Sequence, residues 1–328
     1  MKSKKGVIGI QFNWVFILIA GVLILLFFGS LVFKGKEVSD LAIAETILTN
    51  MQTIMTGAEV SVRTINPIKI PDKEIRVDCD SLSVGKISKP ITKNTIVFSP
   101  ESIKGRTLLA WALDWNAPYH VTNFLYLTTP NIKYIFVNSG NDYAKELYNL
   151  LPNEINKQII EPDYIEDVKD TGNYLRFVFF NNPKPEDITL SSSVEKLSNT
   201  KVSAININQD FNEIEFYKKT GSGFESAGNA GYLNNPMILG AMFSGNLEDY
   251  KCNLEKAFNK LNIVSNVYEK RTNSLRKLYA GTGCISYYDI SPFLIDYSKA
   301  SIADIKLAIK SIETSNMYLQ SSSCPTIY

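Results

Sequence analysis

The hydrophobic pattern of this chain begins with one long uncharged run. Residues Val15 to Phe33 hold nineteen successive positions without a charged side chain. The hydrocarbon core of a bilayer is crossed by about 20 predominantly apolar residues in a helix. The pattern therefore predicts a single transmembrane helix over residues 15–33, preceded by a basic leader or juxtamembrane segment over residues 1–14.

A second pattern follows over residues 37–60, where apolar side chains recur at steps of three and four. This spacing is typical of an amphipathic helix with one apolar stripe. The stripe must be covered by protein because the opposite face of the helix is polar. We expect a stalk helix that packs against the chain's own head domain or against a neighbouring subunit. Its stripe comprises Leu41, Ala44, Leu48, Met51 and Met55.

Beyond the stalk, short apolar segments alternate with helical ones. Such alternation predicts an open mixed α/β domain with parallel strand pairs over residues 65–235. Segment 213–218 alternates apolar and polar residues, which predicts an edge strand. The expected strands cover 133–139, 174–180 and 201–208, and the expected helices cover 141–151 and 192–199.

The C-terminal region, residues 236–328, carries two longer helical patterns. One spans 246–279 and the other spans 302–319, with a loop that contains Gly, Pro and Tyr between them. Two amphipathic helices joined in this way predict an antiparallel hairpin packed on the α/β unit or on the stalk. The fold class is thus α/β with an N-terminal membrane helix and a C-terminal helical hairpin.

Charge distribution predicts the orientation in the membrane. Lys2, Lys4 and Lys5 precede the apolar run, whereas only Lys34 and Lys36 follow it, a bias that favours a cytoplasmic N-terminus. Residues after 34 would then lie outside the cytoplasm, with the plasma membrane as the location. The rest of the chain, 37–328, carries 29 basic and 33 acidic residues. This is not the basic footprint of a nucleic-acid-binding protein.

The four cysteines carry structural information. No two of them have the C-x-x-C spacing, and the chain has a single histidine, which argues against a zinc site. Cysteines outside the cytoplasm usually form disulfides. An antiparallel hairpin would bring Cys252 to Cys324 and leave Cys79 for Cys284. The alternative is four buried free thiols.

Segment 111–124, WALDWNAPYHVTNF, holds the first candidate site. Read as a helix, it places Trp111 and Trp115 on one face, and its apolar surroundings predict that these rings belong to the core. If the segment were exposed instead, Asp114 and His120 could act as an acid–base couple. With one histidine in the chain, triad chemistry would depend on His120 alone.

Two loops are further candidates. Ser139 to Asp142 joins a predicted strand to a predicted helix, where an α/β sheet can bind ligands. Asn141 or Asp142 is better explained as the cap of that helix. The stretch 220–231 is rich in glycine, but Gly228 comes two positions too late for a dinucleotide fingerprint. We therefore expect a flexible surface loop there, and no cofactor or metal.

The first 35 residues resemble the class III leader of archaeal type IV pilins and archaellins. The resemblance rests on a basic segment that ends in Lys5-Gly6 and leads into an apolar helix with a polar residue near its start. In that family a peptidase cuts after the glycine, which would make Val7 the mature N-terminus. Glu is common at mature position five, where this chain has Gln11. A plain uncleaved anchor is the alternative, and residues 33–36 lack the A-x-A exit of an ordinary signal peptide.

Together these patterns predict a membrane-anchored extracytoplasmic protein with a structural or interaction role, such as a component of a pilin-like surface assembly. Its partners would be the lipid bilayer and either other proteins or further copies, joined through the N-terminal helix. The alternative from a different class is an anchored ectoenzyme or ligand-binding domain. That alternative would use the region of Asp114 and His120 or the 139–142 loop.

Overall fold

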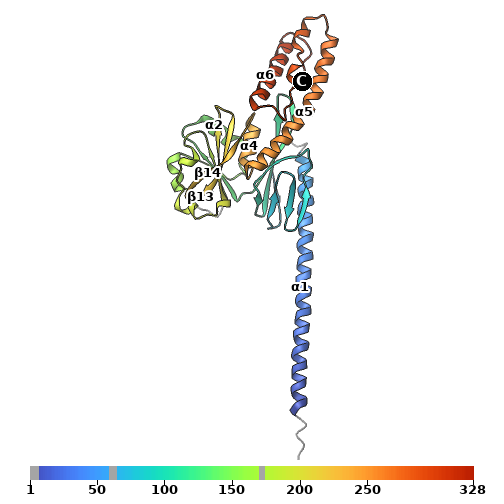
Figure 1. The fold of residues 1–328 in the computed structure, drawn as a ribbon, viewed down its shortest axis with the longest axis vertical. Coiled ribbons are helices and arrows are strands. Elements are labelled where there is room, and N and C mark those ends of the chain that lie inside the picture. The colour runs from blue at the N-terminus through green and yellow to red at the C-terminus, as the bar shows by residue number, and fades with distance from the viewer. Residues whose placement is uncertain (1–6, 59–64, 170–173) are drawn as a thin grey trace, which may run out of the picture.

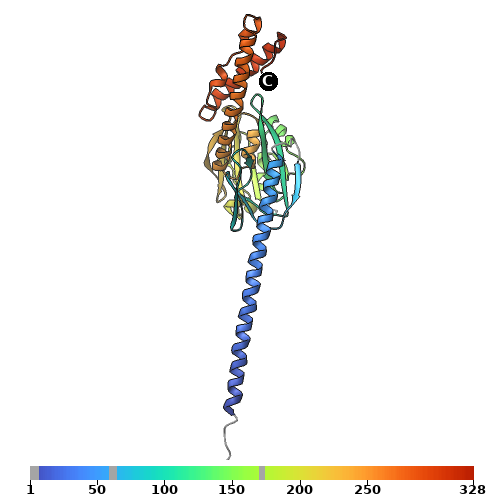
Figure 2. The same cartoon turned by 90° about the vertical axis from the view of Figure 1, so that its right-hand side faces the viewer.

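A single long helix and a head at its far end dominate the fold (Figures 1 and 2). The computed structural model describes residues 7–58, 65–169 and 174–328, without the side chains of 7–17, 20, 27–38 and 58. Helix α1 (Val7–Ala58) is continuous, so the two predicted segments 15–33 and 37–60 belong to one helix. By the α-helical rise, its 52 residues extend over about 78 Å.

The predicted transmembrane segment lies partly outside the described side chains, and Gly6 of the predicted leader lies outside the described residues altogether. Where side chains of the apolar run are described, large apolar ones such as Leu23 and Leu25 are exposed. Among the residues whose structure is described, no helix is long and apolar enough to cross a membrane.

Two small sheets pack against one face of the C-terminal third of α1. In the first sheet the strand order is β1-β7-β8-β5, and in the second it is β4-β3-β2-β6. The first consists of β1 (Ile65–Lys69), β5 (Ile96–Phe98), β7 (Thr107–Asn116) and β8 (His120–Thr128), and the second of β2 (Ile75–Val77), β3 (Ser81–Val84), β4 (Ile87–Pro90) and β6 (Ser102–Ile103).

The prediction of a helix around Trp111 is wrong, because this segment forms the β7–β8 hairpin. Both faces of the hairpin are buried. Leu108 and Ala110 point to the core that contains α1, whereas Leu109 and Trp111 point to the main core. A strand with apolar cover on both faces loses the usual alternation of apolar and polar residues. That loss explains why the sequence looked apolar all round, as a buried helix would.

The third and largest sheet has six strands in the order β10-β9-β11-β12-β13-β14. The first four pair in parallel and the last two pair antiparallel. This confirms the mixed α/β class. The strands are β9 (Ile132–Val137), β10 (Lys157–Ile160), β11 (Tyr174–Phe179), β12 (Val202–Asn208), β13 (Glu213–Thr220) and β14 (Gly223–Gly231).

Two predictions for this sheet are wrong. Segment 213–218 is not an edge, because β13 lies between β12 and β14. The glycine-rich stretch 220–231 is mostly strand β14, not a loop. Its glycines permit close packing against helices: a Cβ on Gly228 would lie 2.8 Å from Leu247, and one on Gly231 would lie 2.5 Å from Ile302.

Short helices complete the α/β unit. Helix α2 (Asp142–Leu150) confirms the predicted helix over 141–151, whereas the predicted helix over 192–199 shrinks to the single turn α3 (Ser192–Glu195). The 3-10 turns in this part are η1 (Pro162–Asp167), η2 (Pro185–Asp187) and η3 (Asn199–Lys201).

The C-terminal region contains the two predicted helices, but their relative direction differs from the prediction. Ile302 lies against Gly231 of the head, whereas Tyr318 stacks on Tyr287 beyond the end of the preceding helix. Both helices therefore run away from the head, and the chain between them returns toward it. The elements are α4 (Asn235–Phe243), α5 (Leu247–Leu278), η4 (Gly283–Tyr287), η5 (Ser291–Leu294) and α6 (Ile302–Ser321).

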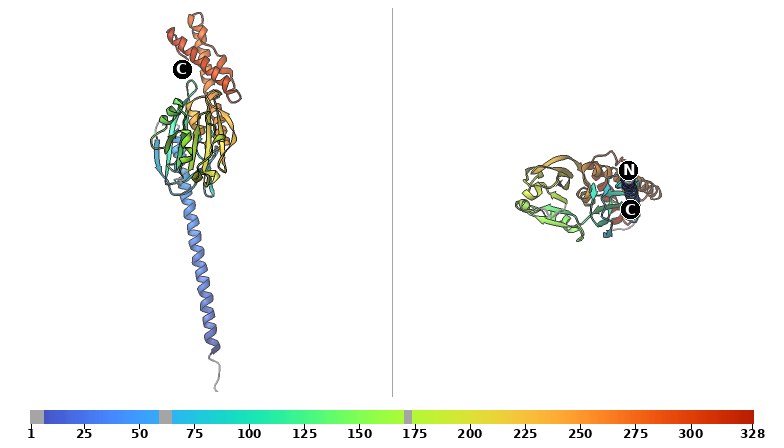
Figure 3. Two further views of the ribbon diagram at one scale, coloured as in Figure 1. Left: turned by 90° about the vertical axis from the view of Figure 1, so that its left-hand side faces the viewer. Right: turned by 90° about the horizontal axis from the view of Figure 1, so that it is seen from below.

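The main core crosses the predicted domain boundary at residue 235. Phe98 of β5 packs against Tyr126 of β8 and Tyr250 of α5, with ring centroids 5.8 and 5.9 Å apart. Buried side chains of the six-stranded sheet and of α6 belong to the same cluster. The C-terminal helices thus extend the core of the head upward, away from α1 (Figure 3).

The close contact between α4 and Phe98 gives a test of this core. A Cβ on Gly240 would lie 2.8 Å from the Phe98 ring, whereas a Cβ on Gly57, near the end of α1, would meet no atom within 4 Å. We expect Gly240→Ala to lower the free energy of unfolding by about 1–3 kcal/mol, as overpacking does. Gly57→Ala should leave it unchanged or raise it by up to about 1 kcal/mol through helix propensity.

Denaturant unfolding of both variants, followed by tryptophan fluorescence, makes the comparison. Both substitutions replace a helical glycine, so the difference between them isolates the contact with Phe98. Equal stability of the two variants would contradict the described packing of α4.

Candidate functional site: the seat of the stalk helix and its disulfide clamp

The stalk helix is held in the head by its apolar stripe. The side chains of Ala44, Leu48, Met51 and Met55 are buried, and Ile47 joins them, while Leu41 is 39% exposed. These residues share a core with both small sheets. Full burial of one such large side chain contributes about 1.5–3 kcal/mol. The prediction that protein covers the stripe is confirmed for Ala44, Leu48, Met51 and Met55, whose cover is the chain's own head, but not for Leu41.

Polar contacts define how α1 sits on the sheets. Lys73, in the turn between β1 and β2, forms an ion pair of 2.9 Å with Asp40. Lys89 of β4 pairs with Glu45 and donates to the Thr49 hydroxyl. Exposed ion pairs contribute little to stability, so their role is to fix the register of the helix against the sheet.

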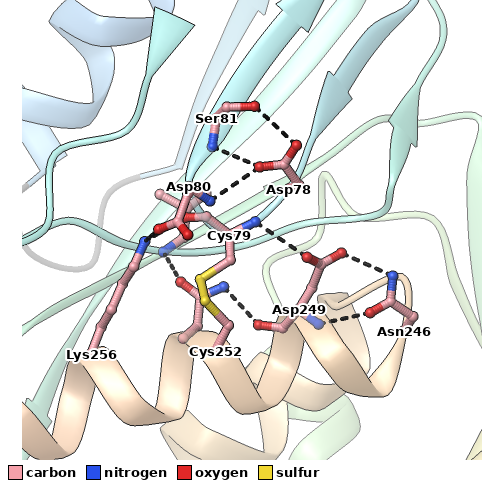
Figure 4. Close-up of a disulfide and its surroundings, with 10 residues drawn as sticks. Asp78, Cys79, Asp80, Ser81, Asn246, Asp249, Cys252 and Lys256 are labelled. Carbon is pink, nitrogen blue, oxygen red and sulfur yellow. Dashed lines mark hydrogen bonds and ion pairs between the residues drawn. A yellow bond between two sulfur atoms is a disulfide. The ribbon is translucent and has the colours of Figure 1, made fainter.

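A disulfide joins this seat to the start of α5. Cys79, two residues after the end of β2, is bonded to Cys252, with a Cα–Cα distance of 6.1 Å (Figure 4). The sheet that contains β2 packs on α1, and α5 extends to the C-terminal unit. The bond therefore links the stalk covalently to the far end of the molecule.

Hydrogen bonds surround the bond on both sides (Figure 4). The Asp249 carboxylate accepts from the Cys79 amide at 3.2 Å and from the Asn246 amide side chain at 2.9 Å. Asn246 in turn caps α5 by accepting from the Asp249 amide. Burial raises the pKa of Asp249. Lys256 donates to the Cys79 carbonyl and forms an ion pair of 3.0 Å with Asp80. We call these contacts the disulfide clamp.

One further side chain fastens α5 at this point. Asn253 is almost fully buried, and its oxygen accepts from the backbone amide of Val97 at the edge of the first sheet, at 3.1 Å. Its amide group donates to the Asp249 carbonyl at 2.9 Å. A buried polar side chain of this kind is costly unless it is paired, so Asn253 fixes α5 against β5.

The second disulfide holds the chain end. Cys284 is bonded to Cys324, with a Cα–Cα distance of 5.9 Å. The tail that follows returns along α5, and Tyr328 packs edge-on against Tyr119 and Tyr268. Tyr119, at the tip of the β7–β8 hairpin, stacks on Tyr268 at 4.0 Å. The tail therefore fastens the C-terminal unit to the first sheet.

All four cysteines are paired, but the predicted pairing is wrong. The prediction Cys252–Cys324 and Cys79–Cys284 assumed that α6 runs back toward the head. Because α6 runs away from it, Cys324 ends beside Cys284, far from the start of α5. Within the described residues, the one group with metal-ligand geometry is Cys79, Asp80 and Cys252. Its two sulfurs are bonded to each other, so it offers a cation only the Asp80 carboxylate.

Asp114 and His120 lie on the same hairpin but do not face each other in its register. Asp114 is opposite Asn123, and His120 is opposite Asn116. Asp114 is half-buried and accepts a hydrogen bond of 2.9 Å from the Asn116 side chain. His120 is exposed. The core interpretation holds for Trp111 and Trp115, whose rings pack on Tyr126 and Phe124.

The 139–142 loop is a helix cap, as the sequence favoured. The Asn141 side chain accepts from the Tyr143 amide at 2.9 Å. The Asn138 side chain accepts from the Asn141 amide, and the Ser139 hydroxyl donates to the Asn182 carbonyl. These side chains are engaged in holding the carboxyl end of β9 together.

The sequence reasoning missed a buried cation. Arg176 of β11 is 5% exposed and lines a groove of about 820 Å³ between the six-stranded sheet and the small sheet that contains β2 and β6. Its guanidinium donates to the carbonyls of Ala241 and Ser244 at 2.9 and 2.8 Å, and to the Ser203 hydroxyl at 2.7 Å. A signal was present, since Arg176 is the one charge within YLRFVFF.

Arg176 thus serves as a C-cap of α4. Cations are favourable at a helix C-terminus, where carbonyls lack intrahelical partners. Burial lowers the pKa of Arg176 to about 10, so the side chain stays cationic at neutral pH. Arg176 therefore joins the six-stranded sheet to α4. The guanidinium N–H groups that donate to Ser203 and to the α4 carbonyls have a structural role.

No protein-family description, no characterised protein and no solved structure matches this chain.

The two disulfides differ in the length of chain they close. Cys79 and Cys252 are separated by 173 residues, and Cys284 and Cys324 by 40. In the chain-entropy picture the bonds stabilise the fold by about 5 and about 4 kcal/mol. We expect the double variant Cys79→Ala/Cys252→Ala to lose more unfolding free energy than Cys284→Ala/Cys324→Ala. A non-reduced peptide map that joins Cys252 to Cys324 would contradict the pairing itself.

Substitutions of two neighbouring residues at the hairpin tip should change the free energy of unfolding by very different amounts. His120→Ala removes an exposed ring and should change stability by no more than about 0.5 kcal/mol. Tyr119→Ala removes a ring that is buried between Tyr268 and Tyr328, and should cost about 3–5 kcal/mol. Thermal unfolding of the two variants compares them. A large loss in His120→Ala would show that this side chain has a role the fold does not explain.

Proposed function

We propose that this chain is a single-pass, membrane-anchored extracytoplasmic protein with a structural or interaction role. The observation that carries the proposal is the continuity of α1. One helix begins at Val7, includes the whole uncharged run 15–33, and ends inside the head, where its last third belongs to the core. A helix built in this way transmits the position of its N-terminal part to the head without a flexible joint.

The exposure of the apolar run supports a lipid environment. Seven of its described side chains between residues 18 and 26 are at least half exposed, among them Leu18, Leu23 and Leu25. Contiguous apolar surface of this size is rare on a soluble monomer and indicates contact with protein or membrane. Because the uncharged run also has the length of a bilayer core, lipid is the simplest cover.

The pairing of the cysteines supports an extracytoplasmic location for the head. Two disulfides, with all four cysteines paired, are typical of oxidising compartments outside the cytoplasm. The basic residues Lys2, Lys4 and Lys5 favour a cytoplasmic N-terminus. Both arguments support an extracytoplasmic position for the residues after 34.

A finer form of the proposal is a component of a pilin-like surface assembly. It rests on the resemblance of the first 35 residues to an archaeal class III leader and on the long N-terminal helix that enters a head. Mass spectrometry of the native chain distinguishes the two branches. A mature N-terminus at Val7 supports the pilin-like form, and retention of Lys2 to Gly6 supports a plain anchor.

The proposed alternative, an ectoenzyme, has weaker support. Asp114 is bonded to Asn116 and His120 is exposed on the other strand, so the pair offers no shared pocket for a substrate among the described cavities. The 139–142 loop is committed to capping α2. No described contact favours catalysis at either place.

Two single cysteines test the topology. In the native disulfide-bonded background, Ser274→Cys adds an exposed thiol on α5, and Ile8→Cys adds one before the apolar run, beyond any cleavage at Gly6. We expect an impermeant maleimide to label Ser274→Cys in intact cells. It should label Ile8→Cys only after lysis.

A deletion provides the control for anchoring. The full chain should resist extraction of membranes at alkaline pH, and a variant without residues 1–36 should be released. The reverse labelling pattern would overturn the orientation, and release of the full chain would overturn the anchor.

A further inference from the structure

We propose that the end of the head nearest the stalk is a basic surface that docks on the anionic lipid headgroups of the bilayer holding the chain. This inference rests on the proposed membrane anchor and adds a second attachment to it. We call the surface the proximal rim. It consists of Lys69, Asp72, Lys73, Glu74, Arg76, Lys86, Lys104 and Arg106, together with Asp40 of α1.

Strand register shows which end of the head the rim occupies. The tip of the β7–β8 hairpin carries Tyr119, which stacks on Tyr268 of the C-terminal unit. The other end of β7 begins at Thr107, opposite Lys69 of β1. The rim therefore lies at the end of the head away from the C-terminal helices, and Figures 1 and 2 show the free length of α1 leaving from that end.

Contacts with α1 place the rim turns around the helix. Lys73 forms an ion pair with Asp40. Lys69 borders the same groove as Ser39 of α1, and Lys86 borders a second groove with Asp40. Arg106 lies 3.7 Å from Asp72 and Lys104 lies 3.1 Å from Glu74, which adds the loop between β6 and β7 to the rim.

The rim has a charge opposite to that of the rest of the exposed chain. It holds six basic side chains and three carboxylates, a surplus of three positive charges. Residues 37–328 as a whole hold more acidic than basic residues, 33 against 29. The basic side chains also reach into solvent: the side chain of Arg106 is 84% exposed, and Lys69 and Lys86 are exposed. Without the rim, residues 37–328 hold 23 basic and 30 acidic residues, so the rim is more basic than the rest of the chain taken as a whole.

The helical rise sets the distance from the rim to the bilayer. Seven residues separate Phe33, the last residue of the apolar run, from Asp40, a rise of about 10 Å along α1. The headgroup layer adds about 5–8 Å to each side of the hydrocarbon core. The phosphates would thus lie within about one Debye length, roughly 8 Å at physiological salt, of the rim.

At that distance the attraction is substantial. Each Lys or Arg close to an anionic leaflet changes the ratio of docked to undocked heads by a factor of about five. Between the apolar run and Asp40 the sequence holds Lys34 and Lys36 against Glu37, a surplus of one positive charge. The rim is thus complementary to a surface of anionic lipid and would hold the head upright on it.

The full chain in lipid nanodiscs tests the inference. Discs are made from phosphatidylcholine alone or from phosphatidylcholine with phosphatidylglycerol. Amide hydrogen exchange is followed in the rim turns 70–74, 84–87 and 104–106. We expect exchange in these turns to slow several-fold on the anionic discs, and high salt to remove the effect because it screens exposed charges.

Matched triple variants identify the cause. Lys69→Gln/Lys86→Gln/Arg106→Gln should lose the slowing on anionic discs. Lys270→Gln/Lys277→Gln/Lys310→Gln, which removes the same charge from exposed positions on α5 and α6, should keep it. Equal exchange on both kinds of disc, or equal loss in both variants, would overturn the docking. A chain that enters neither kind of disc would instead overturn the proposed anchor.

Discussion

The β7–β8 hairpin is the constraint on which the other parts of the head depend. Its two strands are apolar on both faces, so neither face can meet water without a large loss of burial free energy. Alternate residues therefore serve two cores: Leu125 and Leu127 pack toward α1, while Phe124 and Tyr126 pack toward α4 and α5. The stalk helix therefore packs on one face of the hairpin, and the helices α4 and α5 pack on the other.

Two buried cations connect helices to the six-stranded sheet. Arg176 donates to carbonyls at the C-terminal end of α4, and the buried Lys219 donates to the carbonyls of Glu195, the last residue of α3, and of Leu197 just beyond it. A buried cation needs partners, and a helix C-terminus offers unpaired carbonyls with a favourable dipole. Each cation thereby attaches a helix to the six-stranded sheet.

The sequence predicted the parts of this fold whose patterns are local. The strands at 133–139 and 174–180 and the apolar stripe of Leu48 and Met51 follow from period and burial alone. The direction of α6 could not be predicted, because it depends on the return of residues 279–301 toward the head. The cysteine pairing followed from that direction and failed with it. In the same way, the glycine-rich sequence of β14 is typical of a loop. Its glycines are explained only by the helices α5 and α6 that pack closely against them.

The candidate site was less accessible to prediction than the fold. The disulfide clamp depends on Asp249 and Asn253, which are ordinary polar positions on an amphipathic helix until β2 and β5 are placed beside them. Arg176 gave a signal as a lone charge in an apolar strand, but its partners come from α4, about 65 residues later in the chain.

The clamp also determines how a mechanical load would travel through the protein. A pull on Tyr328 reaches Cys324, crosses to Cys284, descends α5 to Cys252, and crosses to Cys79. From there it reaches α1 through β1 and the seat of the stalk. The chain between Cys79 and Cys252, which includes the whole six-stranded sheet, is bypassed by a covalent bond and carries no tension along its backbone. A pull along this path would therefore load α5, the two disulfides and α1, and would leave strands β9 to β14 outside the loaded path.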